Sequence, residues 1–268
     1  MKYFFKDWKR IKKAAGAKEV MLFLDYDGTL TPIAPTPSQA LIPPEVKKTL
    51  LEYSKTPSCS LAVVSGRALR DIKKMVGVPG IFYVGNHGFE IEGPGIFFEN
   101  LMTLDVKAVM EKIKEDLKKK FSGIEGVFLE DKYFTFSVHY RLAQISREPL
   151  VKRILKEVCR PFLRRKKIKM SFGKKVVEVR PPLAWDKGNA VLWLLAKRRY
   201  ALRGKDVLPV CVGDDATDED VFQALKGKGI TIVVGRNKKS AARYYVESPS
   251  EVHRLIAQIL DLKRIIKI

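Results

Sequence analysis

The chain has 268 residues and 46% hydrophobic content, enough for one large core or for a core with a second, smaller domain. No apolar run approaches the roughly 18 residues that cross a bilayer, and the basic N-terminus lacks the apolar stretch of a signal peptide, so we expect a cytoplasmic protein without a membrane span. Three scattered cysteines, Cys59, Cys159 and Cys211, exclude a disulfide framework and a thiolate metal site. The 51 basic and 30 acidic residues give a net charge of +21.

This charge attracts anions of several kinds, including nucleic acid, anionic lipid and phosphorylated metabolites. The densest basic runs lie at 111–121 and 164–169, and we interpret them as solvated helix faces or loops. Because no module typical of nucleic-acid binding is recognisable, we expect no nucleic-acid partner.

The first hundred residues predict strands and helices in alternation. Short, continuous apolar runs predict buried strands, and amphipathic segments between them predict helices, one opening with Pro44 and one ending at Gly77. The expected strands are 19–24, 60–66 and 81–88, and the expected helices are 3–15, 44–56 and 67–77.

The middle of the chain breaks this alternation. It predicts a helix over 100–120, a hairpin over 126–141 whose second strand alternates as a half-exposed strand does, a helix over 148–163 and strands near 167–171 and 175–179. We therefore predict an inserted α+β domain at 100–182.

The alternation of strand and helix then resumes. Helices are expected at 186–201, 216–225 and the end of the chain, with strands at 207–215 and 229–235. The fold class is α/β: residues 1–99 and 183–268 form a Rossmann-like core with a parallel sheet.

Polar residues follow four of the expected strands. They are Asp25 and Asp27, Ser65, Asn86 and His87, and Asp214 and Asp215. Ligands of open α/β sheets bind outside the carboxyl ends of the strands, so we expect these side chains to share one site.

Close carboxylates repel one another unless a cation lies between them, and oxygen ligands without His or Cys favour Mg²⁺. A metal next to a carboxylate can hold a phosphate and lower its charge, so that an aspartate can attack phosphorus. A second aspartate two residues on can give and take the proton.

These residues resemble the motifs of the haloacid dehalogenase superfamily of phosphatases: "DYDGT", a strand-end serine, a downstream lysine and "GDD". In that superfamily the order of motifs is most similar to the trehalose-6-phosphate phosphatases. The matching segments are "LDYDGTLTPI", "VVSGR", "GNHGFE", "SVHYR", "VEVRP", "DKG" and "VGDDATDED", over about residues 20–236.

The resemblance implies a role for each residue of the core. Asp25 is the nucleophile that forms an aspartyl-phosphate, and Asp27 is the general acid and base. Ser65 and Lys187 bind the transferring phosphoryl group. Asp25, Asp27 (through its backbone carbonyl) and Asp214 hold Mg²⁺.

Two further aspartates have open roles. Asp215 is a partner of metal-bound water or a helix cap, and Asp218 either orients Lys187 or caps the helix that follows it. Arg67 either holds phosphate or forms a local ion pair.

The resemblance also makes the insert a cap that carries part of the sugar site. The implied substrate-binding residues are Arg67, Asn86, His87 and Gly88 in the core, and Glu130, His139, Arg141, Glu178 and Arg180 in the cap. Structural alternatives remain for the cap residues, since His139 can be a satisfied strand histidine and the two arginines can pair with the two glutamates.

The resemblance implies a monomeric Mg²⁺-dependent phosphatase that hydrolyses the small molecule trehalose 6-phosphate in trehalose biosynthesis. Two alternatives stay open. One is the same chemistry on sucrose 6-phosphate or on glucosyl- or mannosyl-3-phosphoglycerate. The other is an inactive, basic, anion-binding protein.

Overall fold

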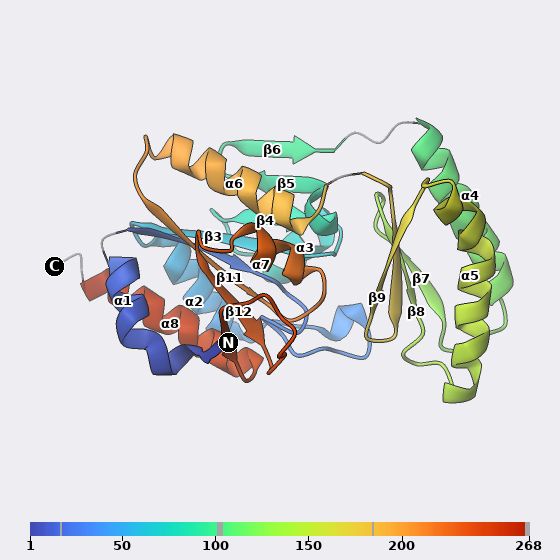
Figure 1. Cartoon of the computed structure of the whole chain (residues 1–268), viewed down its shortest axis with the longest axis horizontal. Helices are drawn as coiled ribbons and strands as arrows, with labels where there is room; N and C mark the ends of the chain where they lie inside the picture. The colour runs from blue at the N-terminus through green and yellow to red at the C-terminus, as the bar shows by residue number, and fades with distance from the viewer. Residues whose placement is uncertain (17, 101–103, 184, 266–268) are drawn as a thin grey trace. The chain divides into compact units, whose positions relative to one another are not determined.

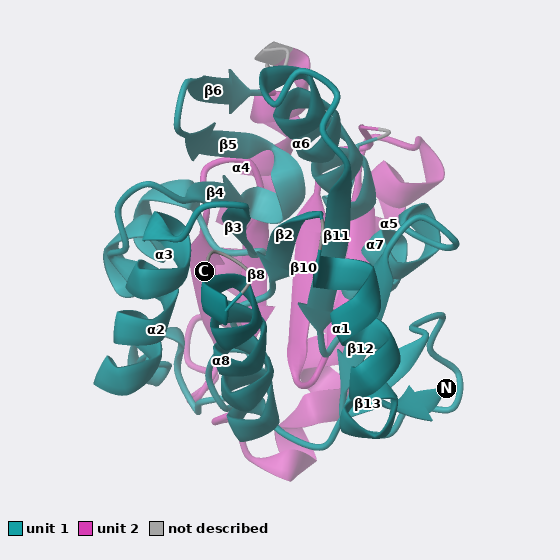
Figure 2. Ribbon diagram, turned by 90° about the vertical axis from the view of Figure 1, so that its left-hand side faces the viewer, with its two compact units in different colours: residues 1–99, 185–268 teal, residues 100–184 magenta. Residues whose placement is uncertain are grey.

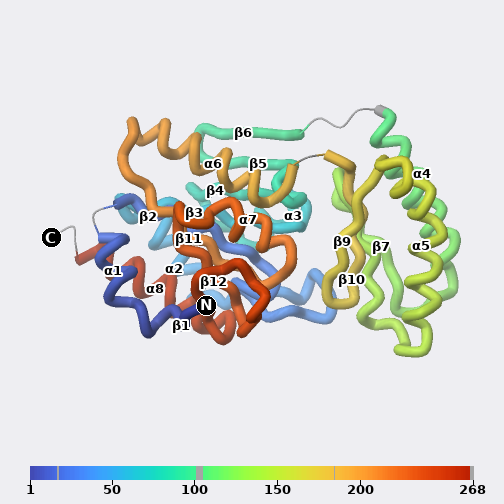
Figure 3. Tube along the Cα trace, in the orientation of Figure 1, coloured from blue at the N-terminus to red at the C-terminus, as the bar shows by residue number. Residues whose placement is uncertain are grey.

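The computed structural model describes residues 1–16, 18–100, 104–183 and 185–265. The chain divides into two compact units (Figure 2): unit 1 is Met1–Glu99 with Trp185–Ile268, and unit 2 is Asn100–Ala184. Unit 1 contains both ends of the chain (Figure 3).

Unit 1 is built on a nine-stranded sheet in the order β1-β13-β12-β11-β2-β3-β4-β5-β6. The strands are β1 (Lys2–Tyr3), β2 (Glu19–Leu24), β3 (Cys59–Val64), β4 (Phe82–Gly85), β5 (Glu90–Gly93), β6 (Ile96–Glu99), β11 (Val207–Gly213), β12 (Ile230–Val234) and β13 (Tyr244–Val246). All neighbouring strands from β1 to β4 in this order pair in parallel, which confirms the predicted α/β class.

Helices cover both faces of this sheet (Figure 1). They are α1 (Trp8–Gly16), α2 (Pro44–Lys55), α3 (Leu69–Val76), α6 (Lys187–Ala201), α7 (Asp218–Ala224) and α8 (Pro249–Ile265). The predicted boundaries at Pro44 and Gly77 are confirmed, and Gly77 ends α3 in the left-handed conformation that glycine adopts without strain (φ 57°).

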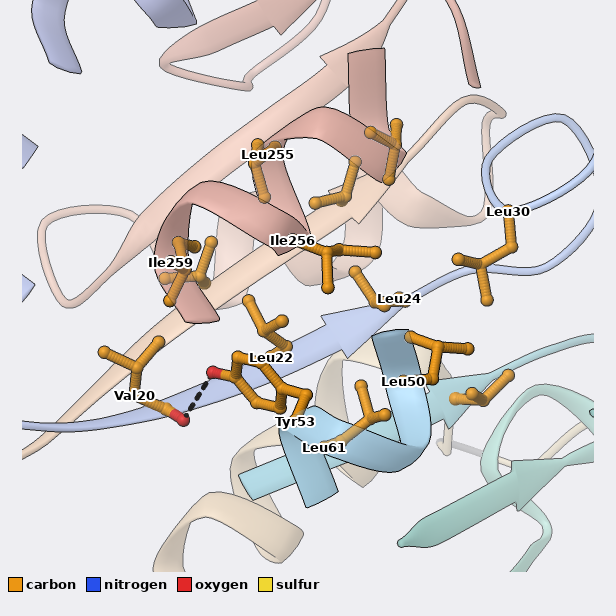
Figure 4. Close-up of a cluster of buried hydrophobic side chains, with 14 of the residues drawn as sticks. Val20, Leu22, Leu24, Leu30, Leu50, Tyr53, Leu61, Leu255, Ile256 and Ile259 are labelled. Atoms are coloured by element: carbon orange, nitrogen blue, oxygen red, sulfur yellow. Dashed lines mark hydrogen bonds between the residues drawn. The ribbon is translucent and has the colours of Figure 1, made fainter. Parts of the chain in front are cut away.

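The central strand β2 is buried on both faces, and its side chains divide between two cores. Leu22 and Leu24 pack on α2 and α8 (Figure 4), whereas Met21 and Phe23 pack with residues of α6 and α7. Tyr53 is fully buried in the first core, where its hydroxyl donates to the Val20 carbonyl at 3.0 Å. Burial on both faces explains the continuous apolar run of this strand.

The expected strand at 81–88 is wrong in its second half. β4 ends at Gly85, because Asn86 (φ 48°) and His87 (φ 55°) take left-handed conformations and leave the sheet. The chain then returns as the antiparallel strands β5 and β6, which the sequence analysis did not predict.

Unit 2 is a four-stranded antiparallel sheet, in the order β7-β8-β10-β9, with two helices on one face. Its elements are α4 (Leu104–Phe121), β7 (Phe128–Asp131), β8 (Phe136–His139), α5 (Glu148–Arg164), β9 (Lys169–Gly173) and β10 (Val176–Arg180). Residues 101–103 of the expected helix at 100–120 lie outside the described residues.

The prediction of a half-exposed strand in the hairpin is wrong. Of the alternating residues Tyr133, Thr135 and Ser137, only Tyr133 is exposed (58%), whereas Thr135 and Ser137 are each 1% exposed. Thr135 Oγ1 donates to Glu178 Oε1 at 3.1 Å, and Ser137 lies between Glu130 and Glu178 in the register of the sheet. Polar partners on neighbouring strands allow polar side chains to be buried here.

Leu22→Ala should lower the free energy of unfolding of unit 1 by about 2–5 kcal/mol, because a fully buried leucine leaves a cavity. Urea denaturation followed by tryptophan fluorescence measures this, since Trp8, Trp185 and Trp193 all belong to unit 1. Leu41→Ala, at a side chain 70% exposed, is the matched control and should change stability by less than about 0.5 kcal/mol. Equal effects would contradict the assignment of the core.

Candidate active site

The direction of strand connection reverses between β2 and β11, which are neighbours in the sheet. From β2 the chain continues to β3 and β4 on one side, and from β11 it continues to β12 and β13 on the other. This is the switch point at which open parallel sheets bind ligands. Asp25 and Asp214 directly follow these two strands.

Lys187 joins the acids of this edge. It is the first residue of α6, only 2% exposed, and its Nζ donates to Asp25 Oδ1 at 2.8 Å and to Asp218 Oδ1 at 3.0 Å. Asp186 caps the same helix by accepting from the Asn189 amide at 2.8 Å, which fixes the position where Lys187 leaves the backbone. The predicted link between Asp218 and Lys187 is therefore present.

Burial and charge act against each other in this cluster. Burial raises the pKa of Asp25 well above its usual value, with Asp218 and Asp214 adding to the effect and Lys187 opposing it. Burial likewise raises the pKa of Asp218 to about 7. Burial disfavours the ammonium of Lys187, but Asp218 and Asp25 outweigh it and hold that pKa well above the ordinary value. A divalent cation would favour the ionised carboxylates.

Asp25, Asp214 and Asp218 each offer a carboxylate oxygen within 4.8 Å of the others, a set of hard ligands that suits Mg²⁺. Gly28 makes room for this set, because a Cβ there would lie 2.3 Å from Asp214 Oδ2 and the backbone has φ 87°. The residues present therefore fit a metal ion. Asp218, which the sequence analysis did not name as a ligand, contributes to this set while its oxygens also accept hydrogen bonds from Lys187 and from the Asp214 amide.

The Asp215 side chain accepts hydrogen bonds from the residues that follow it. Its Oδ1 accepts from the Thr217 amide at 2.8 Å and from the Thr217 hydroxyl at 2.7 Å, at the start of α7. These bonds form an Asx turn just before the helix, whose cap residue Thr217 has no side-chain capping hydrogen bond, so the choice between the two roles of Asp215 stays open. Burial alone would raise the pKa of Asp215, but Lys187 and the Thr217 hydrogen bond reverse this and lower it. Asp218 instead accepts the Asp214 amide at 3.0 Å with Oδ2.

Asp27 is held by Arg67. Arg67 Nη2 and Nε donate to the two carboxylate oxygens of Asp27 at 2.6 and 2.7 Å, a bidentate pair. The guanidinium also lies over the ring of Tyr26, 5.3 Å from its centroid, and Arg67 is only 7% exposed. Of the two roles open for Arg67, the local ion pair is the one observed.

Ser65, after β3, and the "GNHG" segment, at the end of β4, lie in two buried loops that bond to each other beside this pair. Ser65 Oγ accepts the Arg67 amide at 3.1 Å, and the Arg67 carbonyl accepts the Asn86 amide at 2.7 Å. The Gly88 carbonyl accepts from Trp185 Nε1 at 2.7 Å. The core residues that were predicted to bind substrate thus belong to two loops that are joined by hydrogen bonds.

In unit 2 four of the five predicted sugar residues share one face of the sheet. Val177 and Val179 of β10 face the helices, so Glu178 and Arg180 lie on the opposite face. Glu130 and His139 share this face and are joined, with 2.7 Å between Glu130 Oε2 and His139 Nε2.

Lys132 lies between the two glutamates of this face. Its Nζ is 3.5 Å from Glu178 Oε1 and 3.9 Å from Glu130 Oε2, and the residue is 8% exposed. Arg141, by contrast, follows the end of β8, and its Nη2 donates to the Lys174 carbonyl at 2.9 Å.

The comparisons with known proteins agree on one family. Residues 23–250 match the model of the trehalose-phosphatase family. The chain belongs to the trehalose-phosphatase family.

Relatives in this family include trehalose-phosphate phosphatase B of Arabidopsis thaliana, 35% identical over 95% of this chain and 70% of its own length. Trehalose-phosphate phosphatase of Mycobacterium leprae is 34% identical over 92% of this chain and 60% of its own length. The C-terminal domain of Candida albicans trehalose-6-phosphate phosphatase shares the fold, with a TM-score of 0.81 at 23% identity, over 97% of this chain and 99% of that one.

Two residues of this trehalose-phosphatase were missed by sequence reasoning. Lys132 lies in a turn, where a lone lysine is normally solvated. Only its burial between two acids identifies it as a candidate site residue. Glu90 accepts from the Asn86 side chain and, at 3.3 Å, from the Leu69 amide. It stands inside the quoted "GNHGFE", so that motif was the available signal.

No described helix of this trehalose-phosphatase is both long enough and apolar enough to cross a membrane.

Lys187→Met should destabilise the protein by about 3–5 kcal/mol, because it leaves buried carboxylates without their cation. In the variant, raised carboxyl pKa values mean that the folded state binds more protons than the unfolded state, so the loss should grow from pH 5 to pH 8. Chemical denaturation without added metal at both pH values measures this. Lys226→Met, at an exposed lysine, is the control. A Lys187→Met protein as stable as the parent would contradict the electrostatic account.

Proposed function

We propose that this protein is a phosphatase that uses Mg²⁺ to hydrolyse trehalose 6-phosphate to trehalose and phosphate, the last step in making trehalose. The observation that carries the proposal is the cluster of Asp25, Lys187, Asp218 and Asp214 at the switch point, in a chain of the trehalose-phosphatase family. We expect it to act as a cytoplasmic monomer on this small molecule.

Asp25 attacks the phosphorus of the substrate. Its Oδ1 accepts from Lys187, so we assign the attack to Oδ2. A bond forms between this oxygen and phosphorus, the bond from phosphorus to the sugar oxygen breaks, and an aspartyl-phosphate results. Lys187 and Ser65 balance and orient the phosphoryl oxygens, and bound Mg²⁺ would neutralise further charge there.

Asp27 moves the proton in both halves of the reaction. It gives a proton to the departing sugar oxygen, and it later takes one from the water that attacks the aspartyl-phosphate and frees phosphate. Arg67 fixes both oxygens of Asp27, so we assign Arg67 as the residue that positions this acid and base. Because the carboxylate is already held in place, orienting it for proton transfer adds little entropic cost to the activation free energy.

Unit 2 supplies the sugar specificity in this proposal, as a cap. The face that carries Glu130, Lys132, His139 and Glu178 presents charged acceptors and donors, which suit the hydroxyl groups of a disaccharide. Arg180 Nε is buried without a hydrogen-bond partner among the described residues, so a substrate hydroxyl could satisfy it. Arg141, whose Nη2 donates to the Lys174 carbonyl, is the remaining cap residue that we assign to the substrate.

Phosphate release from a panel of sugar phosphates tests the function. The panel is trehalose 6-phosphate, sucrose 6-phosphate, glucose 6-phosphate and glucosyl-3-phosphoglycerate, each with Mg²⁺ and with a chelator. We expect preference for trehalose 6-phosphate and loss of activity on chelation. Asp25→Asn should abolish turnover with the fold intact. Preference for another member would overturn the sugar assignment, and turnover by Asp25→Asn would overturn the nucleophile.

Arg67→Leu should slow release from trehalose 6-phosphate by about 10²–10⁴-fold, since it disorders the general acid. Release from para-nitrophenyl phosphate should fall much less, because its leaving group needs no proton. Steady-state kinetics on both substrates measures the difference. Arg70→Leu, at an exposed arginine three residues on, is the control. An equal loss on both substrates would show that Arg67 binds the phosphoryl group instead.

A further inference from the structure

The outer side of α5 carries a concentrated positive charge that the proposed reaction does not use. Between residues 152 and 167 every basic side chain is exposed. They are Lys152, Arg153, Lys156, Arg160, Arg164, Arg165, Lys166 and Lys167. The one acid of the stretch is Glu157. We call the eight cations the α5 basic face; five of them lie on α5 and three directly follow its last residue, Arg164.

The cations of this face form no close ion pairs with the described acids. In the described part of the chain none of the eight forms an ion pair within 4 Å. Glu157 itself faces a cation of the neighbouring helix, with 4.0 Å between its Oε2 and Lys120 Nζ. Lys152, Lys156, Arg160 and Arg164 follow one another at four-residue steps, so they form a row roughly 18 Å long (12 residues at 1.5 Å).

The second basic run of the sequence lies beside this face. The Lys120 contact places the end of α4, with the exposed Lys118, Lys119 and Lys120, alongside the middle of α5, and Figure 1 shows the two helices side by side. Two basic runs that lie some forty residues apart in the sequence thus form one wider basic surface. Such a surface attracts polyanions strongly.

The composition of the face indicates how a partner would bind. The apolar side of α5, with Val151, Leu155 and Val158, is committed to the core of unit 2, so it has no apolar face to insert into a bilayer. Phe162, the aromatic residue of the stretch, packs against that core and offers no platform for unpaired bases. What remains is a row of charges.

We propose that the α5 basic face binds the phosphate backbone of double-stranded nucleic acid without regard to sequence. Charge alone supplies affinity for a duplex, and evenly spaced cations on a helix meet its regular array of phosphates. This departs from the expectation of no nucleic-acid partner. That expectation rested on the absence of a known module, whereas the face is assembled only by the packing of α4 on α5.

Fluorescence anisotropy tests the proposal. A labelled 20-base-pair duplex is titrated with the full-length protein, in the presence of chelator, at NaCl concentrations between 50 and 200 mM. With about five phosphates neutralised, the logarithm of the binding constant should fall with a slope of roughly −4.5 against the logarithm of salt, a loss of roughly 500-fold over this range. Single-stranded DNA of the same length should bind more weakly.

The decisive comparison uses two variants of equal net charge. The first variant combines Lys156→Gln, Arg160→Gln and Arg164→Gln. It should make the slope of the logarithm of the binding constant against the logarithm of salt shallower by roughly 2.7, at 0.9 per phosphate. The control variant combines Lys205→Gln, Lys226→Gln and Lys228→Gln. It removes three exposed cations of unit 1 and should leave the slope unchanged. Circular dichroism verifies that both are folded, and Lys152→Gln with Arg153→Gln is a second test of the face.

Three results would overturn the proposal. Absence of duplex binding at 50 mM NaCl would contradict the proposal directly. Equal losses in the two triple variants would assign the binding to net charge and not to this face. Tighter binding to vesicles of phosphatidylcholine with phosphatidylserine than to duplex, lost in the α5 variant, would make the partner an anionic lipid surface.

Discussion

The ammonium of Lys187 between Asp25 and Asp218 is the interaction on which the core site depends. Three carboxylates at one sheet edge would repel one another in a buried place, and a fixed cation makes their proximity tolerable. The fold supplies that cation at the first residue of α6, where the Asp186 cap fixes the helix start. The same charge that stabilises the cluster is available to a phosphoryl group, so stability and chemistry share one residue.

Around this cluster the loops after the strands hold one another in place. Arg67 fixes Asp27 by its guanidinium while its backbone joins Ser65 and Asn86. Glycines permit the closest approaches, as where Gly28 meets the Asp214 carboxylate. The result is a preorganised set of groups whose positions do not have to be found during the reaction.

Unit 2 uses its two sides differently. One side of its sheet gathers Glu130, Lys132, His139 and Glu178 in a connected polar array, which we assign to the sugar. The helices on the other side bury their apolar faces and turn exposed cations outward. A two-layer domain with one shared core can therefore present two surfaces of distinct chemistry.

The sequence by itself determined the α/β class and the identity of the residues at the strand ends, because apolar strands that stop at polar residues are local patterns. It could not show that β4 stops at Gly85 to let Asn86 and His87 turn, nor that Thr135 and Ser137 are buried beside Glu178. It also left the role of Arg67 open and gave no signal for Lys132, because their ion pairs depend on partners 40 and 46 residues away. Those pairings, and the merging of two basic runs on one face, were decided only by tertiary packing.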